Sequence, residues 1–140
     1  MGQYYYIVNL DKKQFLHPHK FDDGLKLMEF GQSSGGTLLG LTILLADGNG
    51  RGNGDIDSED SIIGSWAGDK IVIAGDYADG GKFIPKISAA TLQQIAKNRF
   101  SEGHQSKENV NLHSFAGEVF EDISADVVKC LKKAKEWQRR

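Results

Sequence analysis

Three aspartates flank a short apolar segment near the middle of the sequence. Asp69 precedes residues 71–74, and Asp76 and Asp79 follow them. Glycines stand directly before the first two aspartates and leave the backbone there accessible. Carboxylates at the ends of a strand are placed for general acid–base catalysis, or for holding a divalent cation or a nucleotide. The alternative is that they accept hydrogen bonds from backbone N–H groups in local turns.

Two aromatic residues, Trp66 and Tyr77, stand in the same part of the sequence. Such side chains often anchor protein interfaces, and they also fill hydrophobic cores. We therefore consider two interpretations of this segment. In the first it forms a partner-binding surface, and in the second the aromatic rings belong to the core. The predicted surface consists of Trp66, Asp69, Asp76, Tyr77 and Asp79.

Residues 47–60 are rich in glycine and aspartate, and we expect them to form a surface loop. Aligned on Gly54 as the turn glycine, the segment has some features of an EF-hand calcium loop. However, Arg51 occupies a ligand position and cannot bind a cation. The sequence therefore predicts no cofactor. In the alternative with bound Ca²⁺, the metal ligands would be Asp55, Asp57 and Asp60.

The other reactive residue types form no known catalytic motif. His17 and His19 would point to the same side of an extended chain and could form a metal pair with a distant carboxylate. The proline between them and the lack of a second cluster argue against this. Cys130 stands alone within a helical pattern, so we expect it to be a small apolar core residue.

Composition places the chain among ordinary globular domains. It has 140 residues, of which 39% are hydrophobic and 26% charged, and its formal net charge is −2. This length suits one domain. The sequence has neither a long apolar stretch nor a signal-peptide pattern, so we expect a cytoplasmic protein without a membrane segment. Its last twelve residues are basic, but the acidic middle would repel a phosphate backbone, and we do not expect nucleic-acid binding.

Hydrophobic patterning predicts the elements that must position these side chains. Residues 4–10 and 14–17 suit an N-terminal hairpin, and residues 71–74 suit a central strand buried on both faces. Residues 24–30 fit a strand or a short helix. Helices are expected over 37–46, with Gly48 following its end, and after the N-cap candidates Ser88 and Ser124. Short strands are expected at 110–112 and 119–123. The predicted fold is a single α+β domain over residues 1–140. It has a small mixed or antiparallel sheet, with helices, including a C-terminal one, packed on one side.

Several short strings resemble a family of small uncharacterised bacterial and phage proteins. They are MGQYY at residues 1–5, GLKLMEF at 24–30, WAGD at 66–69 and GDYAD at 75–79. The resemblance carries no catalytic residue to this chain. It implies a small accessory protein, such as an immunity or anti-defence factor, that acts on a macromolecular partner.

These observations lead to a leading hypothesis and an alternative. The leading hypothesis is a binding or regulatory protein without catalytic activity, whose partner is another protein. The alternative is a small enzyme, or a protein that binds a metal or nucleotide through the aspartates at the strand ends. The two differ in one geometric requirement, because only the alternative needs those carboxylates to converge.

Overall fold

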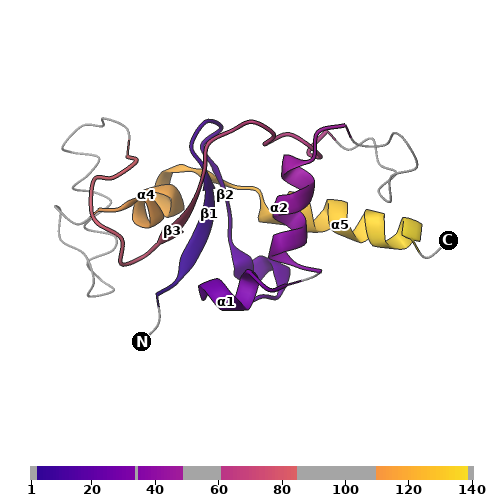
Figure 1. Ribbon diagram of the computed structural model, residues 1–140, viewed down its shortest axis with the longest axis horizontal. Coiled ribbons are helices and arrows are strands. Elements are labelled where there is room, and N and C mark those ends of the chain that lie inside the picture. Colours follow the sequence, from indigo (N-terminus) through magenta and orange to yellow (C-terminus); the bar gives the residue numbers. More distant parts are fainter. Residues whose placement is uncertain (1–2, 34, 49–60, 85–109, 139–140) are drawn as a thin grey trace.

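The computed structural model describes residues 3–33, 35–48, 61–84 and 110–138, with side chains as far as Lys133 (Figure 1). The predicted helix after Ser88 and most of the loop at 47–60 lie outside these residues. The described chain forms an α+β unit, as predicted. Its elements in order are β1 (Tyr5–Asn9), β2 (Gln14–Leu16), the 3₁₀ helix η1 (Pro18–Phe21), α1 (Leu27–Phe30), α2 (Thr37–Leu45), β3 (Ile71–Gly75), α4 (Leu112–Val119), β4 (Glu121–Asp122) and α5 (Ser124–Gln138).

The strands form a mixed four-stranded sheet in the order β3-β1-β2-β4. The predicted N-terminal hairpin is confirmed, since β1 and β2 are antiparallel. β3 is antiparallel to β1, and β4 is parallel to β2. The predicted strand at residues 71–74 is confirmed as β3, but its predicted central position in the sheet is wrong. Among the described strands, β3 pairs with β1 alone and therefore lies at the edge of the sheet, while the hairpin strands β1 and β2 lie in the middle.

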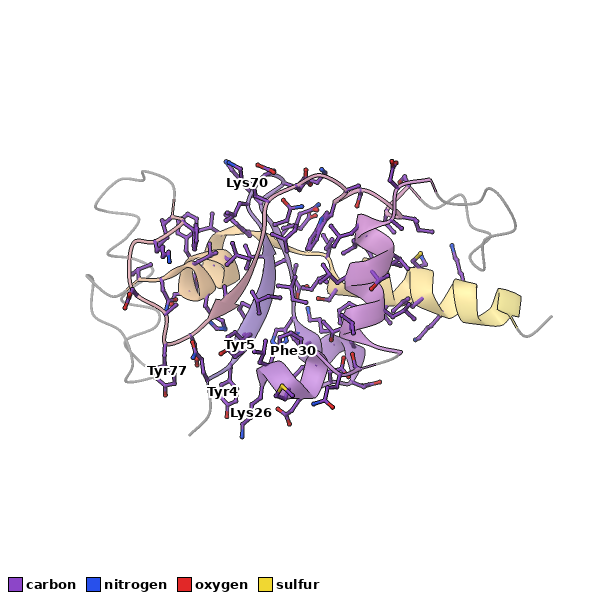
Figure 2. The ribbon with its side chains drawn as sticks, in the orientation of Figure 1. Tyr4, Tyr5, Lys26, Phe30, Lys70 and Tyr77 are labelled. Carbon is purple, nitrogen blue, oxygen red and sulfur yellow. The ribbon has the colours of Figure 1, made fainter. Side chains whose placement is uncertain are left out.

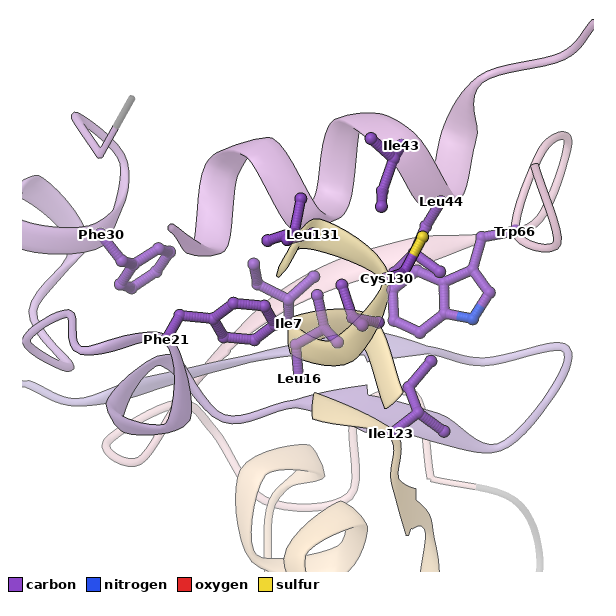
Figure 3. Close-up of a cluster of buried hydrophobic side chains, with 11 residues drawn as sticks. Ile7, Leu16, Phe21, Phe30, Ile43, Leu44, Trp66, Ile123, Cys130 and Leu131 are labelled. Atoms are coloured by element: carbon purple, nitrogen blue, oxygen red, sulfur yellow. The ribbon is translucent and has the colours of Figure 1, made fainter. Parts of the chain in front are cut away.

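Side chains alternate between the two faces of the sheet, and each face has its own core. Ile7 and Leu16 point to one face, where they pack with residues of α2, α5 and Trp66 (Figure 3). Val8 and Phe15 point to the other face, where they pack with α4. Figure 1 shows α4 on one side of the sheet and α2 and α5 on the other. The prediction of helices on one side is therefore wrong, because both faces of the hairpin are apolar and need cover.

The apolar helix α2 confirms the prediction for residues 37–46. Its first turn is held by Asp23, whose carboxylate accepts hydrogen bonds from the backbone N–H of Thr37 at 2.7 Å and from its hydroxyl at 2.6 Å. Gly40 allows close packing, since a Cβ there would lie 2.9 Å from the ring of Phe21. Gly48 has a positive φ of 91°, but the helix ends earlier, at an extended Ala46.

The structure also decides the predictions for the three short segments at residues 24–30, 110–112 and 119–123. Residues 27–30 of the ambiguous segment are a short helix, and the strand predicted at 110–112 is wrong. Asn111 instead begins α4, because its side-chain oxygen accepts a hydrogen bond from the backbone N–H of Ser114 at 3.0 Å. The strand predicted at 119–123 is the short β4. The hydroxyl of Ser124 accepts a hydrogen bond from the backbone N–H of His17 at 2.7 Å, which ties the start of α5 to the hairpin.

Candidate functional site

Asp69 holds the beginning of β3 against the hairpin turn. Its carboxylate accepts hydrogen bonds from the side-chain amide of Asn9 at 2.8 Å and from the ammonium of Lys12 at 2.6 Å. The hydrogen bonds from Asn9 and Lys12 hold the pKa of Asp69 below its usual value. Asn9 is fully buried, and its oxygen also accepts hydrogen bonds from two backbone N–H groups of the turn. These contacts give Asp69 a structural role.

Asp76 lies at the opposite end of β3. Its carboxylate accepts a hydrogen bond from the backbone N–H of Tyr4 at 2.9 Å. A strand of this length separates its two ends by roughly 16 Å. Lys70 and Tyr77 mark the two ends in Figure 2. The structure therefore does not bring Asp69 and Asp76 together, and the arrangement of carboxylates required by the catalytic alternative is not formed by these two residues.

Trp66 is a core residue. Its side chain has 0% exposure, and Figure 3 shows it beside Cys130 and Leu44. The indole N–H donates a hydrogen bond to the side-chain oxygen of Gln14 at 2.8 Å. Trp66 therefore does not contribute to an exposed partner-binding surface. Its assignment to that surface is corrected in favour of the core interpretation.

The outer edge of β3 presents unpaired backbone groups among the described strands. The N–H of Leu10 donates to the carbonyl of Lys70, and the N–H of Asp76 donates to the carbonyl of Tyr4. Opposed residues in an antiparallel pair alternate between hydrogen-bonded and non-hydrogen-bonded positions. In the register of β1 and β3, the N–H and C=O groups of Ile71 and Ile73 and the N–H group of Gly75 therefore point away from β1, whereas the carbonyl of Gly75 accepts a hydrogen bond from the N–H of Ala78 at 3.2 Å.

Exposed apolar side chains lie along this edge. Ile73 is 40% exposed, Tyr77 55% and Phe83 50%. Tyr77, Asp79 and Phe83 line a hollow of about 400 Å³ together with residues of β3. The structure thus brings two of the predicted surface residues, Tyr77 and Asp79, to the same place. The sequence alone does not identify Ile73 and Phe83 as surface residues, because nothing in the local pattern distinguishes an edge position from a buried one.

A cluster of aromatic and histidine rings lies on the α4 side of the sheet. The ring of Tyr6 is stacked on His113, with centroids 4.0 Å apart, and lies 5.0 Å from the ring of His17. Burial lowers the pKa of His17 from its ordinary value of 6.5; His19 and Lys20 act in the same direction, and Asp122 opposes them. In the part of the chain described here, no group of three or more histidine, cysteine or acidic side chains is placed to hold a metal ion.

We expect His17 to make stability depend on pH. Its lowered pKa means that the unfolded chain takes up a proton first as the pH falls below 6.5, so the folded state loses stability there. Urea unfolding at about pH 7.5 and about pH 5 should show this loss, which His17→Gln should reduce. His19→Gln removes a neighbour that contributes to the lowered pKa of His17, so it should reduce the loss by a smaller amount than His17→Gln. An equal loss in both variants would contradict the assignment to His17.

The remaining candidate residues carry no structural assignment. Asp55, Asp57 and Asp60, the ligands of the calcium alternative, lie outside the described residues. Within the described ranges, no helix is long and apolar enough to cross a membrane. Comparisons with models of protein families, with curated proteins and with solved structures found no match for this chain. The function must therefore be inferred from the chemistry of the chain itself, and the edge of β3 is the candidate site.

Proposed function

We propose that this chain is a protein-binding module that pairs the outer edge of β3, which has no neighbour among the described strands, with an extended segment of a protein partner. In this mode of recognition, main-chain hydrogen bonds give affinity and pockets for alternate side chains give specificity. The outward N–H and C=O groups of Ile71 and Ile73 and the outward N–H of Gly75 would make the main-chain hydrogen bonds. The hollow beside Tyr77 and Phe83 would receive a side chain of the incoming segment.

One observation carries this proposal. β3 has the sequence IVIAG, with no charge and no proline, although it lies at the edge of the described sheet. Proteins normally protect an exposed edge with charged residues, proline or a bulge, because bare edges pair with other chains. The described part of β3 has none of these protections. An edge of this kind fits a strand that is covered by a partner.

The chemistry of the site also indicates what it would bind. Ile73 and the rings of Tyr77 and Phe83 favour an incoming segment with apolar side chains. Asp79 and Lys82 line the same hollow and offer charges of both signs at its rim. An accessory protein acting on a macromolecular partner, as the family resemblance implies, would use a surface of this kind. The catalytic alternative has no comparable support, because Asp69 and Asp76 are held apart by β3.

The proposal can be tested with a library of displayed random peptides selected on the purified chain. The selected peptides should protect the amide hydrogens of Ile73 and Gly75 from exchange, since these point outward from the sheet. Ile73→Pro should remove an outward N–H group while leaving the hydrogen bonds between β1 and β3 intact, and binding should be lost.

Val72→Pro is the matched control for that experiment. The N–H of Val72 points toward β1, so this variant should lose a ladder hydrogen bond and unfold more readily than Ile73→Pro. Selected peptides that bind Ile73→Pro as well as they bind the unmodified chain, and that protect amides elsewhere, would overturn the proposed function.

A further inference from the structure

The geometry of β3 points to a specific partner for this edge, and we propose that it is β3 of a second copy of the chain. This inference rests on the proposed function and names its partner. The two strands would run antiparallel about a two-fold axis that passes through Ile73. Such an interface uses the same surface on both subunits, so that surface must be complementary to itself. Three properties of β3 meet this requirement.

The first property is the position of the outward-facing backbone groups. In a pairing centred on Ile73, this residue lies opposite Ile73 of the second copy, and Ile71 lies opposite Gly75 of that copy. All of these residues direct their N–H groups away from β1, as Ile71 and Ile73 do their C=O groups, while the C=O of Gly75 accepts a hydrogen bond from the N–H of Ala78. The N–H of Ile73 therefore lies opposite the C=O of Ile73 of the second copy, and the N–H of Gly75 lies opposite the C=O of Ile71 of that copy, which gives four hydrogen bonds across the axis. A shift by one residue would place outward groups opposite residues whose groups already bond to β1.

The second property is the charge at the two ends of the strand. In the register centred on Ile73, Lys70 lies opposite Asp76 of the second copy, and the two-fold axis repeats this pair at the other end. Opposite charges facing each other across strands stabilise a pairing. A shift of two residues in either direction keeps the backbone pattern but separates both charge pairs. The charges therefore select one register, which is also the one that pairs β3 over its full length.

The third property is the exposure of the central side chain. Ile73 lies opposite Ile7 in the sheet, so it points to the face that carries α2 and α5, yet it is 40% exposed. In the dimer, the two Ile73 side chains would lie next to each other across the axis and cover this exposed area. The pairing would join the two four-stranded sheets into one continuous sheet.

The size of the contact sets the expected strength of the dimer. A single pair of short strands buries less than the roughly 1,600 Å² typical of stable complexes. We therefore expect an association that depends on protein concentration and reverses on dilution. Sedimentation velocity over a range from about 1 µM to about 1 mM should show a shift from monomer to dimer.

Cross-linking tests the register directly. Residues directly opposite each other in a hydrogen-bonded pair have Cα atoms about 5.5 Å apart, which suits a disulfide. Mild oxidation of Ile73→Cys should therefore give a covalent dimer. Ile71→Cys, on the same face of the strand, is the matched control: its two copies would lie about 14 Å apart and should not cross-link. The native Cys130 is fully buried and should not interfere.

Charge reversal tests the ends of the pairing. Lys70→Glu would place a glutamate opposite Asp76 of the second copy at both ends, and we expect the dimer to weaken at least several-fold. Lys132→Glu makes the same change in net charge at an exposed position of α5, outside the proposed pairs and the hollow, and it should have little effect. Equal weakening by both variants would show an effect of net charge alone and would overturn the proposed register.

The outcomes separate this inference from the proposed function. A chain that stays monomeric to about 1 mM, with no cross-link through Ile73→Cys, overturns the second copy as the partner. If the selected peptides still protect the amides of Ile73 and Gly75, the proposed function stands and its partner is a different protein. If neither association nor peptide binding involves these amides, both proposals fail.

Discussion

Replacing Trp66 by alanine is expected to lower the free energy of unfolding by about 3 to 5 kcal/mol, the range for removing a large aromatic side chain from a core. The indole is fully buried and packs in the core between the sheet, α2 and α5 (Figure 3). Its removal would leave a cavity and would free the side chain of Gln14 from its hydrogen bond. Urea unfolding followed by circular dichroism measures the change.

Trp66→Phe is the control that separates packing from hydrogen bonding. It retains an aromatic ring in the same place but cannot donate to Gln14, so it should cost clearly less than alanine. If Trp66→Ala left stability unchanged and instead weakened peptide binding, the core assignment would be wrong. Trp66 would then belong to the binding surface predicted from the sequence.

Replacing Asn9 by alanine is expected to cost about 2 to 3 kcal/mol, although this side chain is much smaller. Asn9 is fully buried at the corner where the hairpin turn meets β3. Its amide donates to Asp69, and its oxygen accepts from the N–H groups of Asp11 and Lys12. Alanine would remove the hydrogen bonds of Asn9 to Asp69 and to the backbone N–H groups of Asp11 and Lys12. Urea unfolding is again the measurement.

Asp69→Asn is the matched control at this corner. It retains an oxygen that can accept from Asn9 and loses only the charge opposite Lys12. Ion pairs with an exposed partner contribute little to stability, so this variant should cost less than about 1 kcal/mol. A cost as large as that of Asn9→Ala would show that the ion pair, rather than the buried amide, stabilises the corner.

Local patterns were sufficient to predict the elements in which one short segment determines its own structure. The hairpin, α2 and α5 follow from the apolar patterning and the turn residues of their own segments. The sequence also contains a pattern that is typical of a helix at α4. Asn111 precedes Leu112, Phe115 and Ala116, which have helical spacing, but the segment is short enough to suggest a strand.

The arrangement of these elements depends on contacts between distant residues, and local patterns do not contain it. The apolar run in β3 suggested burial on both faces, but the strand lies at the edge of the described sheet and its Ile73 is 40% exposed. The roles of Asp69 and Asp76 depend on Asn9 and Tyr4, which are 60 and 72 residues away in sequence. Only the folded arrangement distinguishes these structural carboxylates from a catalytic pair.

The position of the hairpin in the sheet has a consequence for synthesis of the chain. β1 and β2 are made first, but they occupy the middle of the strand order, and their neighbours are β3 and β4. Residues 5–9 can pair with β3 only after residues 71–75 have been made, and residues 14–15 can pair with β4 only after residues 121–122 have been made. Until then, both outer edges of a newly made apolar hairpin are bare. Ribosome-bound fragments that end before Ile71 should therefore bind chaperones or aggregate, whereas the nearly complete chain should not.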